Sequence, residues 1–327
     1  MSLRIGFVGA GQMSQQHAKR LAKIPHTEVV AVCHPRPANA RKFVEAQPGE
    51  VTVFTEAETM FQEAALDALY VCVPPFAQDD TVEKAVDQGL HVFLEKPIAL
   101  EVPLARRMVE AAEANQVVTQ VGFQFRFREG VRRLKAAMNQ GETGQPTLFS
   151  GRYWTHMDGN PWWRDRTKSG GQVVEQLIHI YDLAAHFMGP ADLEKTTGYL
   201  ANLCHGNRPD YTIEDTSVGV HRMQAGGVSV ITGSNNALPM HFIGDFRVVC
   251  ENGMLDYHSS GQSWVNPDRS TLYLNGEKAG DWDETGDVTL ALNEDFIKSI
   301  QAGHPAEIPI RDGLRALEWV QAVVDAS

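Results

Sequence analysis

The sequence has no long apolar run, few cysteines and no excess of basic residues. A membrane-spanning helix needs about 18 or more consecutive apolar residues, so a membrane span is excluded. The four cysteines (Cys33, Cys72, Cys204 and Cys250) are scattered without a Cys-x-x-Cys pair, which predicts reduced thiols in a cytosolic protein. The formal net charge of −12 argues against a nucleic-acid or anionic-membrane partner. The first residues lack the basic and apolar regions of a signal peptide, so we expect a cytoplasmic protein.

At 327 residues, the chain is long enough for two domains. Up to residue 121, short apolar runs alternate with segments of helical spacing. The predicted strands are Ile5–Val8, Val29–Cys33, Val51–Phe54, Ala68–Val73, His91–Leu94 and Val117–Val121. The predicted helices are Gln15–Ile24, Asn39–Glu45, Asp79–Gln88 and Pro103–Ala114. Continuous apolar strands are typical of parallel sheets buried on both faces, so residues 1–121 predict a doubly wound α/β domain of the Rossmann type.

Residues 122–327 show a different pattern, in which strands follow one another across short turns. The strand candidates are Leu148–Trp154, Thr216–Met223, Val228–Gly233, Phe246–Glu251 and Ser263–Val265. The predicted helices are Glu129–Asn139, Gln172–Met188 (ended by Gly189 and Pro190), Val288–Gln301 and Gly313–Asp325. Consecutive strands with short connections predict a second, α+β domain with a mostly antiparallel sheet.

The glycine loop Gly9–Ser14 follows the first strand and opens a helix. Gly9 permits the tight turn, and Gly11 lets the backbone approach a pyrophosphate at the helix N-terminus. Ser14 stands where Gly or Ala is usual. A glycine-rich turn alone is weak evidence, but its place at the head of a βαβ unit predicts a dinucleotide site.

The end of the second strand bears on the choice between NAD and NADP. An acidic residue there would bind the ribose 2′-hydroxyl of NAD, but His34 occupies the position. Arg36 or Arg41 could instead pair with a 2′-phosphate, although both could equally be solvated surface residues. The missing acid favours NADP over NAD.

Two segments carry candidate catalytic groups. Glu95-Lys96-Pro97 ends the fifth strand, which aims Lys96 at the cofactor crevice and makes Pro97 a candidate for a cis bond. On a later helix, Glu175, His179 and Asp182 share one face at spacings of four and three. His179 suits a general base, which Glu175 could orient. A buried structural network is the alternative, and the lack of a second histidine at ligand spacing predicts no metal site.

In their joint order these motifs resemble the glucose–fructose oxidoreductase / inositol dehydrogenase / rhizopine-catabolism (Gfo/Idh/MocA) family of NAD(P)-dependent oxidoreductases. The resemblance rests on Gly9–Ser14 with His17, Val73-Pro74-Pro75, Glu95-Lys96-Pro97, Gly122–Phe127 and the helix from Gly170 to Asp182. It implies a Rossmann domain followed by a domain with a large, open, mostly antiparallel sheet that forms homodimers or homotetramers. Glu175 stands where the family usually has aspartate, Leu177 where glycine is common, and Gln78 where histidine is frequent.

The resemblance also implies a reaction: hydride transfer between a nicotinamide and a secondary alcohol or ketone of a sugar, polyol or inositol. In oxidation, His179 takes the hydroxyl proton while Lys96 stabilises the alkoxide, with Glu175 beside them. The predicted cofactor-binding residues are Gly9, Gly11, Gln12, Met13, His34, Arg36, Val73, Pro74, Glu95, Lys96 and Gln124. The predicted substrate-binding residues are Arg126, Trp163, Arg164, Glu175 and Asp182.

Two other functions stay open on the same fold. One is a cofactor- or sugar-sensing regulator without turnover, and the other is a reductase of a non-sugar carbonyl or imine. Fold alone does not decide among them. The presence of both Lys96 and His179 favours an enzyme.

Overall fold

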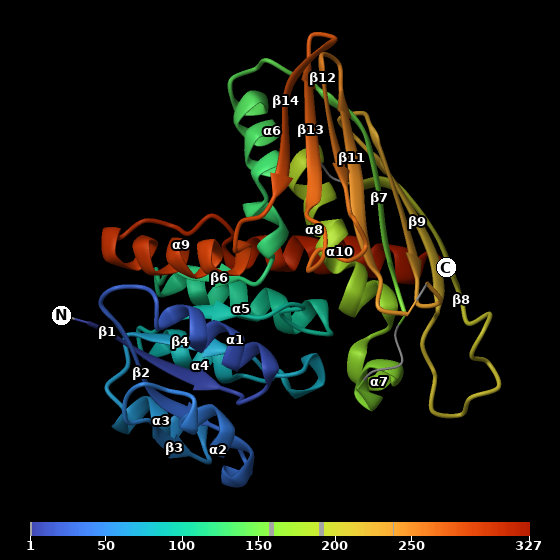
Figure 1. Cartoon of the computed structure of the whole chain (residues 1–327). Helices are drawn as coiled ribbons and strands as arrows, with labels where there is room; N and C mark the ends of the chain where they lie inside the picture. The colour runs from blue at the N-terminus through green and yellow to red at the C-terminus, as the bar shows by residue number, and fades with distance from the viewer. Residues whose placement is uncertain (1, 157–159, 190–192, 238) are drawn as a thin grey trace. The chain divides into compact units, whose positions relative to one another are not determined.

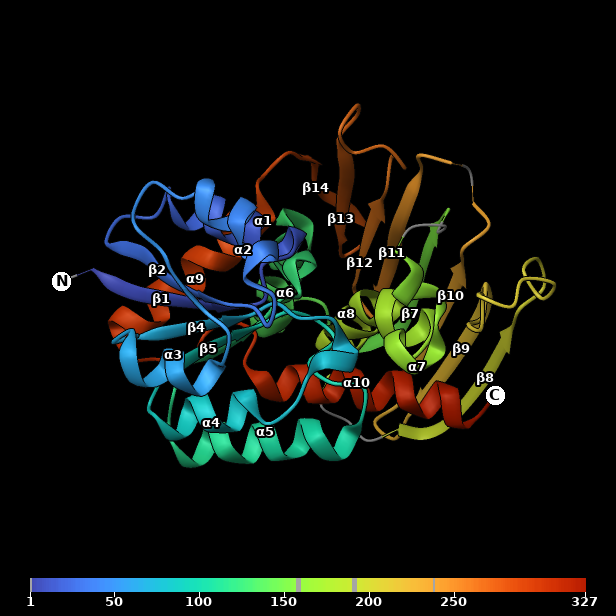
Figure 2. The same ribbon diagram turned by 90° about the horizontal axis from the view of Figure 1, so that it is seen from below.

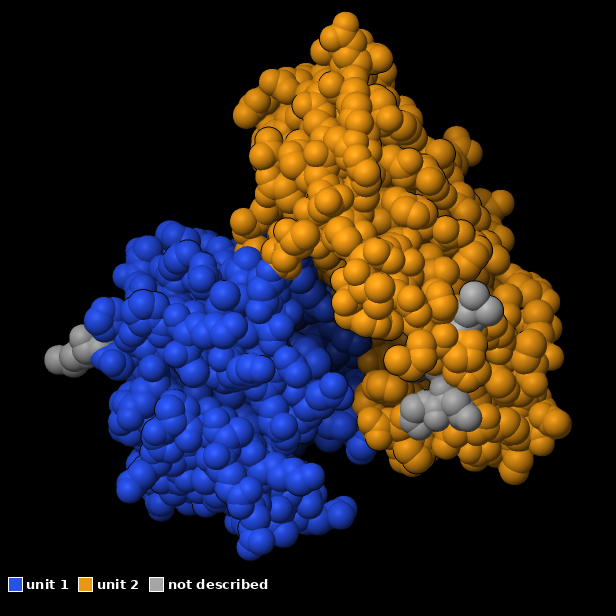
Figure 3. All heavy atoms as spheres, in the orientation of Figure 1, with its two compact units in different colours: residues 1–124, 287–314 blue, residues 125–286, 315–327 orange. Residues whose placement is uncertain are grey.

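The computed structural model describes residues 2–156, 160–189, 193–237 and 239–327. Figure 3 colours its two compact units. Unit 1 comprises Met1–Gln124 and Asp287–Leu314, and unit 2 comprises Phe125–Gly286 and Arg315–Ser327. The domain division into 1–121 and 122–327 stays a prediction, and the compact units differ from it because residues 287–314 pack with the N-terminal unit. Pro190, which the sequence places after a helix, lies outside the described residues.

Unit 1 is built on a parallel sheet of six strands in the order β3-β2-β1-β4-β5-β6. The strands are β1 (Leu3–Val8), β2 (Thr27–Cys33), β3 (Thr52–Phe54), β4 (Ala68–Val71), β5 (His91–Leu94) and β6 (Thr119–Val121). The central residues of β1, β2, β4 and β5 are mostly apolar and buried, because helices cover both faces of the sheet. The predicted doubly wound Rossmann sheet is confirmed.

The helices of unit 1 form a layer on each face of this sheet, as Figures 1 and 2 show. They are α1 (Gln12–Leu21), α2 (Pro37–Glu45), α3 (Ala57–Glu63), the 3₁₀ turn η1 (Pro75–Ala77), α4 (Thr81–Asp87), α5 (Val102–Ala114) and α9 (Val288–Ala302). Helix α9 packs against α1, although 266 residues separate the end of one from the start of the other in the chain. The last helix, α10 (Ile310–Asp325), begins in unit 1 and ends in unit 2.

Unit 2 contains an eight-stranded sheet in the order β14-β13-β12-β11-β7-β10-β9-β8. The strands are β7 (Pro146–Thr155), β8 (Leu193–Ala201), β9 (Thr216–Met223), β10 (Val228–Ser234), β11 (Phe242–Cys250), β12 (Gly253–His258), β13 (Asp268–Leu274) and β14 (Glu277–Glu284). All neighbours are antiparallel except β7 and β10, which run parallel. The predicted mostly antiparallel sheet is therefore confirmed.

The helical segments of unit 2 are η2 (Gln124–Phe127, whose first residue belongs to unit 1), α6 (Glu129–Asn139), η3 (Pro161–Arg164), α7 (Arg166–Ser169), the π-turn η4 (Val173–Leu177) and α8 (Ile178–Met188). Helix α8 packs on β7, β10 and β11, and α6 on β12, β13 and β14. The buried Glu284 carboxylate of β14 accepts the backbone N–H groups of Glu129 and Gly130, both at 2.9 Å, which caps α6.

Three local predictions differ from the structure. Ser263–Val265 was predicted as a strand but forms a turn, in which Trp264 is 61% and Val265 64% exposed. A short apolar run is not enough for a strand when no neighbouring strand pairs with it. The predicted single helix Gln172–Met188 begins with a π-turn. The structure also adds α3, β8, β12, β13 and β14, which have no counterpart among the predicted ranges.

Among the described residues, no helix combines the length and the apolar character needed to cross a bilayer.

Candidate active site

The glycine loop lies in unit 1 between the end of β1 and the start of α1. Gly9 has a φ of +97°, and a Cβ there would stand 2.5 Å from the carbonyl oxygen of Cys72, so only glycine fits. The Ser14 hydroxyl donates to the Gly9 carbonyl at 2.9 Å. This bond closes the loop and explains how a serine serves where Gly or Ala is usual.

The first turn of α1 is open toward its N-terminal side. A Cβ on Gly11, the N-cap residue, would meet no described atom within 4 Å, and Gln12 and Met13 are exposed. The unsatisfied N–H groups and the dipole of a helix N-terminus favour an anion. The loop therefore fits the pyrophosphate of a dinucleotide.

The end of β2 carries the residues that bear on NAD or NADP. The Nδ1 atom of His34 accepts the backbone N–H of Arg36 at 3.0 Å, and Arg36 is the exposed N-cap of α2. The structure also brings a carboxylate to this end of the sheet. Burial, and then the charge of Glu56, raise the pKa of the Cys33 thiol to about 11. The sequence pattern did not indicate Glu56, because this residue follows β3, which pairs with β2, and does not follow β2 itself.

Lys96 is half-buried in the segment after β5, and its peptide bond to Pro97 is cis, as expected. The neighbouring Glu95 is buried, with Oε1 2.7 Å from Nε2 of the fully buried His17. The other oxygen, Oε2, accepts the backbone N–H of Lys96 at 3.2 Å. A Cβ on Gly122 would stand 3.0 Å from both carboxylate oxygens, so a larger residue there would require the carboxylate to shift. Glu95 therefore supports the chain at Lys96, and its predicted cofactor contact stays a prediction.

The carboxyl ends of β1, β4, β5 and β6 lie side by side because these parallel strands are neighbours. Val73 and Pro74 follow β4, Gln124 follows β6, and all three are half-buried. The side-chain amide of Gln78 is buried there, and neither its nitrogen nor its oxygen has a hydrogen-bond partner within the described part of the chain. A buried amide of this kind needs a partner. This edge of the sheet therefore fits the polar groups of a dinucleotide.

The segment with the candidate base lies in unit 2 and begins after two glycines with positive φ, Gly170 (+78°) and Gly171 (+108°). Glu175 lies in the π-turn and His179 in the first turn of α8, and both are buried. The rings of Phe125 and His179 stack with centroids 5.1 Å apart. π-turns are rare in proteins, and those that occur are often found at functional sites. Sequence reasoning missed this one because its apolar pattern resembles that of an α-helix.

Asp182, one α-helical turn further on, is fully buried and paired with Arg126. The guanidinium donates from Nε to Oδ2 at 2.9 Å and from Nη2 to Oδ1 at 2.5 Å. Such a bidentate pair fixes α8 against η2, the segment that also carries Phe125. The predicted substrate contacts of both residues stay predictions, and this geometry favours a positioning role.

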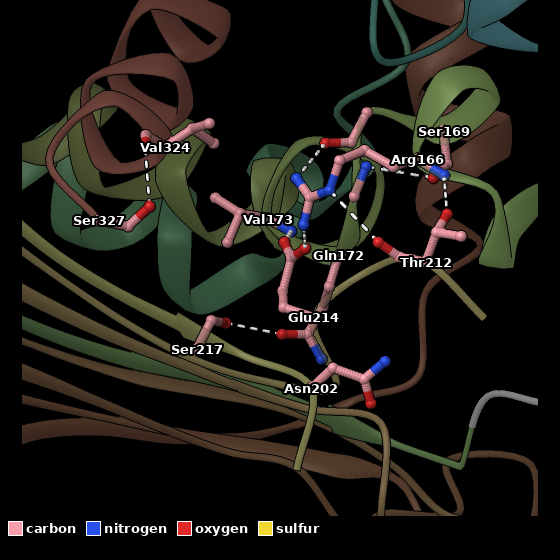
Figure 4. Close-up of polar contacts among 12 residues, drawn as sticks. Arg166, Ser169, Gln172, Val173, Asn202, Thr212, Glu214, Ser217, Val324 and Ser327 are labelled. Carbon is pink, nitrogen blue, oxygen red and sulfur yellow. Dashed lines mark hydrogen bonds and ion pairs between the residues drawn. The ribbon is translucent and has the colours of Figure 1, made fainter. Parts of the chain in front are cut away.

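A second network holds the start of the π-turn (Figure 4). The buried Glu214 carboxylate accepts the backbone N–H of Val173 at 2.9 Å and pairs with the Arg166 guanidinium. Nearby, the Ser217 hydroxyl donates to the Gln172 side chain at 2.6 Å. The connection between β8 and β9 therefore anchors the helix that carries the candidate catalytic residues.

The predicted substrate-binding residues Trp163 and Arg164 lie in η3, next to the same connection. Arg164 pairs with Asp210 at 3.2 Å, and the carbonyl of Arg164 accepts the N–H of Thr212 at 2.8 Å. The indole rings of Trp162 and Trp163 pack edge to face at 5.6 Å. The indole N–H of Trp163 is buried, and no described residue accepts it.

Within the described ranges, no group of three or more His, Cys, Asp or Glu side chains is placed to hold a metal ion.

The fold and the glycine loop together define a protein that binds a dinucleotide through a Rossmann sheet. Residues 3–123 match the family model described as an oxidoreductase family with an NAD-binding Rossmann fold, and residues 131–256 match the GFO/IDH/MocA C-terminal domain. The chain therefore belongs to the GFO/IDH/MocA family of oxidoreductases, as the motifs indicate.

Several relatives act on cyclic polyols. The chain is 26% identical over 325 residues to a myo-inositol 2-dehydrogenase of Thermotoga maritima, covering 96% of this chain and 93% of that protein. It is 27% identical over 198 residues to an NAD⁺-dependent scyllo-inositol 2-dehydrogenase of Bacillus subtilis, covering 60% and 57%. A solved levoglucosan dehydrogenase in complex with NADH and levoglucosan superposes with a TM-score of 0.86 over 100% of this chain and 97% of that one. Its 17% identity makes this a likeness of fold.

Proposed function

We propose that this protein is a dehydrogenase that interconverts a secondary alcohol and a ketone on a cyclic polyol or sugar. The observation that carries the proposal is the buried histidine of unit 2: His179 stacks on Phe125, with Glu175 on the preceding π-turn. Inositol dehydrogenases among the relatives support the substrate class.

The residues have distinct roles in the direction of oxidation. A bound nicotinamide supplies the hydride acceptor for the carbinol carbon. His179 accepts the hydroxyl proton, because an imidazole has a reference pKa near working pH. The Lys96 ammonium stabilises the negative charge that develops on the same oxygen. Glu175 accepts a hydrogen bond from a hydroxyl, and the Trp163 indole N–H is a donor available for another substrate oxygen.

The test is a spectrophotometric screen at 340 nm with NAD⁺ and NADP⁺ against inositols, sugars, polyols and sugar acids. We expect NAD(P)H formation with at least one inositol or sugar. A Lys96→Ala variant and a His179→Gln variant should each lose about 100-fold or more in kcat while still binding NADH. Arg311→Gln, which alters an exposed ion pair with Glu113, is the control.

Two results would contradict this proposal. A wild-type protein that binds NADH but turns over no member of the panel supports the sensing role instead. Turnover that survives both substitutions removes Lys96 and His179 from the mechanism.

We also propose that NADP is preferred over NAD, because His34 and Arg36 replace the usual acid at the end of β2. Glu56 is the nearby carboxylate that acts against a 2′-phosphate. A His34→Asp variant should shift the ratio of kcat/KM toward NAD, and a Glu56→Gln variant should shift it toward NADP. Unchanged ratios in both variants would remove the argument.

The face of the unit 2 sheet opposite α8 is the proposed interface of a homodimer or homotetramer. Gly219 lies against Tyr181 of α8, so its neighbours Val218 and Val220 point to the opposite face of the sheet. On that face the exposed Tyr199 of β8 pairs with Val218. A Val220→Glu variant should shift the sedimentation coefficient toward that of a monomer.

Free thiols at all four cysteines support a cytoplasmic location. Cell fractionation with a tagged chain would test this location.

A further inference from the structure

Tyr153 is an aromatic residue of β7 that the motifs did not single out. Alternate residues of a strand face opposite sides of the sheet, so Gly151 and Tyr153 share a face. A Cβ on Gly151 would stand 2.5 Å from Cγ2 of Ile180, which shows that this face lies against α8. Tyr153 is therefore on the side of the sheet that carries the candidate base.

The tyrosine ring is aligned with the candidate base. The rings of Tyr153 and His179 are nearly parallel, with an interplanar angle of 5° and centroids 6.5 Å apart. Phe242 packs edge-on against Tyr153 with centroids 4.6 Å apart. An aromatic residue held from two sides in this way has a defined position, so its hydroxyl is held at a defined place as well.

The hydroxyl of Tyr153 remains a donor. Burial, and then the charge of the nearby Glu175, raise the pKa of Tyr153, so the phenol keeps its proton at any working pH. The side chain is half-buried, and within the described residues its hydroxyl has no hydrogen-bond partner. A group that both accepts and donates can bind the phenol and the carboxylate at the same time. An alcohol hydroxyl does both.

We propose that Tyr153 is a substrate-binding, specificity-determining residue that donates to a second hydroxyl of the substrate, on the carbon next to the reacting one. Glu175 accepts the hydrogen of that same hydroxyl. The pair selects vicinal diols, which cyclic polyols and sugars have and simple secondary alcohols lack. This inference rests on the proposed function and names the part of the substrate that it recognises.

The test compares parent substrates with analogues that lack the neighbouring hydroxyl: myo-inositol with 1-deoxy-myo-inositol, and D-glucose with 2-deoxy-D-glucose. We expect wild-type kcat/KM to favour the parent by about tenfold or more, because the deoxy analogue leaves polar groups of the site unpaired. Tyr153→Phe keeps both ring contacts and removes the hydroxyl. It should lower kcat/KM for the parent, mainly through KM, to near the value for the analogue, and leave the analogue unchanged.

Arg311→Gln is again the control, because Arg311 forms an exposed ion pair with Glu113 outside the proposed site. It should leave both substrates unaffected. Calorimetric titration of myo-inositol into the protein–NADH complex gives a readout independent of turnover. There, Tyr153→Phe should weaken binding about tenfold.

The outcomes separate the two proposals. If wild type is active but Tyr153→Phe keeps the wild-type preference for the parent, or affects parent and analogue equally, the role of Tyr153 is overturned and the dehydrogenase stands. If wild type neither binds nor turns over any member of the panel, the proposed function fails and this inference fails with it.

Discussion

Replacing His17 by phenylalanine keeps an aromatic ring in the interior of unit 1 but removes both ring nitrogens. His17 is fully buried, its ring centroid lies 4.7 Å from that of Phe93, and its Nε2 lies 2.7 Å from Glu95 Oε1. The variant leaves the buried Glu95 carboxylate without this partner. Leaving a buried carboxylate oxygen without its hydrogen-bond donor costs about 3 kcal/mol or more. Because domains have about 5–15 kcal/mol in total, we expect a large loss of stability.

Two matched variants separate the lost interaction from lost packing. Glu95→Gln is isosteric and can still accept from His17, so we expect it to cost only about 1 kcal/mol. The double variant His17→Phe/Glu95→Leu removes both polar partners together. We expect it to be more stable than His17→Phe alone, because no buried charge is then left unpaired.

The assay is urea unfolding followed by circular dichroism, with extrapolation of the free energy of unfolding to zero denaturant. Two results would refute this reasoning. One is a cost of less than about 1 kcal/mol for His17→Phe. The other is a double variant that is no more stable than His17→Phe alone.

Three further outcomes follow from local geometry. Gly9→Ala should lower Tm and weaken NADH binding, measured by fluorescence titration, because its Cβ meets the Cys72 carbonyl. Gly11→Ala should weaken NADH binding but leave Tm unchanged, because its Cβ meets no described atom. Equal effects on Tm would contradict this difference. Burial lowers the pKa of His221 to about 4, so the unfolded chain binds more protons between that value and 6.5. Stability should therefore rise with pH across this window by up to about 3 kcal/mol, and His221→Leu should flatten the rise. Glu214→Ala leaves the buried N–H of Val173 without its acceptor and should lower the free energy of unfolding by about 1–3 kcal/mol. Glu214→Gln keeps an acceptor and should lower it less, and thermal unfolding of both variants measures the difference.

The sequence alone predicted all six strands of the Rossmann unit, because both faces of its sheet are covered and most of the strands appear as continuous apolar runs. β5 begins and ends at the predicted residues, His91 and Leu94. Polar strands of the second sheet are harder to predict from the sequence. β14 (Glu277–Glu284) is mostly exposed or half-buried and has no apolar alternation. Its pairing with β13, and not its own composition, makes it a strand.

The candidate site shows the same division. Sequence motifs indicated Gly9, Lys96 and His179 as candidates, because each stands at a fixed position relative to a strand or helix that the local pattern reveals. The motifs did not show what supports them. Glu95 pairs with His17 across 78 residues, and the Glu214 carboxylate caps the N–H of Val173 across 41.

The amino-acid sequence by itself determined the fold class, the dinucleotide loop and the family, since these depend on local patterns of apolar residues, glycines and short motifs. Only the tertiary structure decided that residues 287–314 pack in unit 1, that a π-turn carries Glu175, and that Tyr153 lies parallel to His179. These features depend on contacts between residues far apart in the chain, and local spacing carries no record of such contacts.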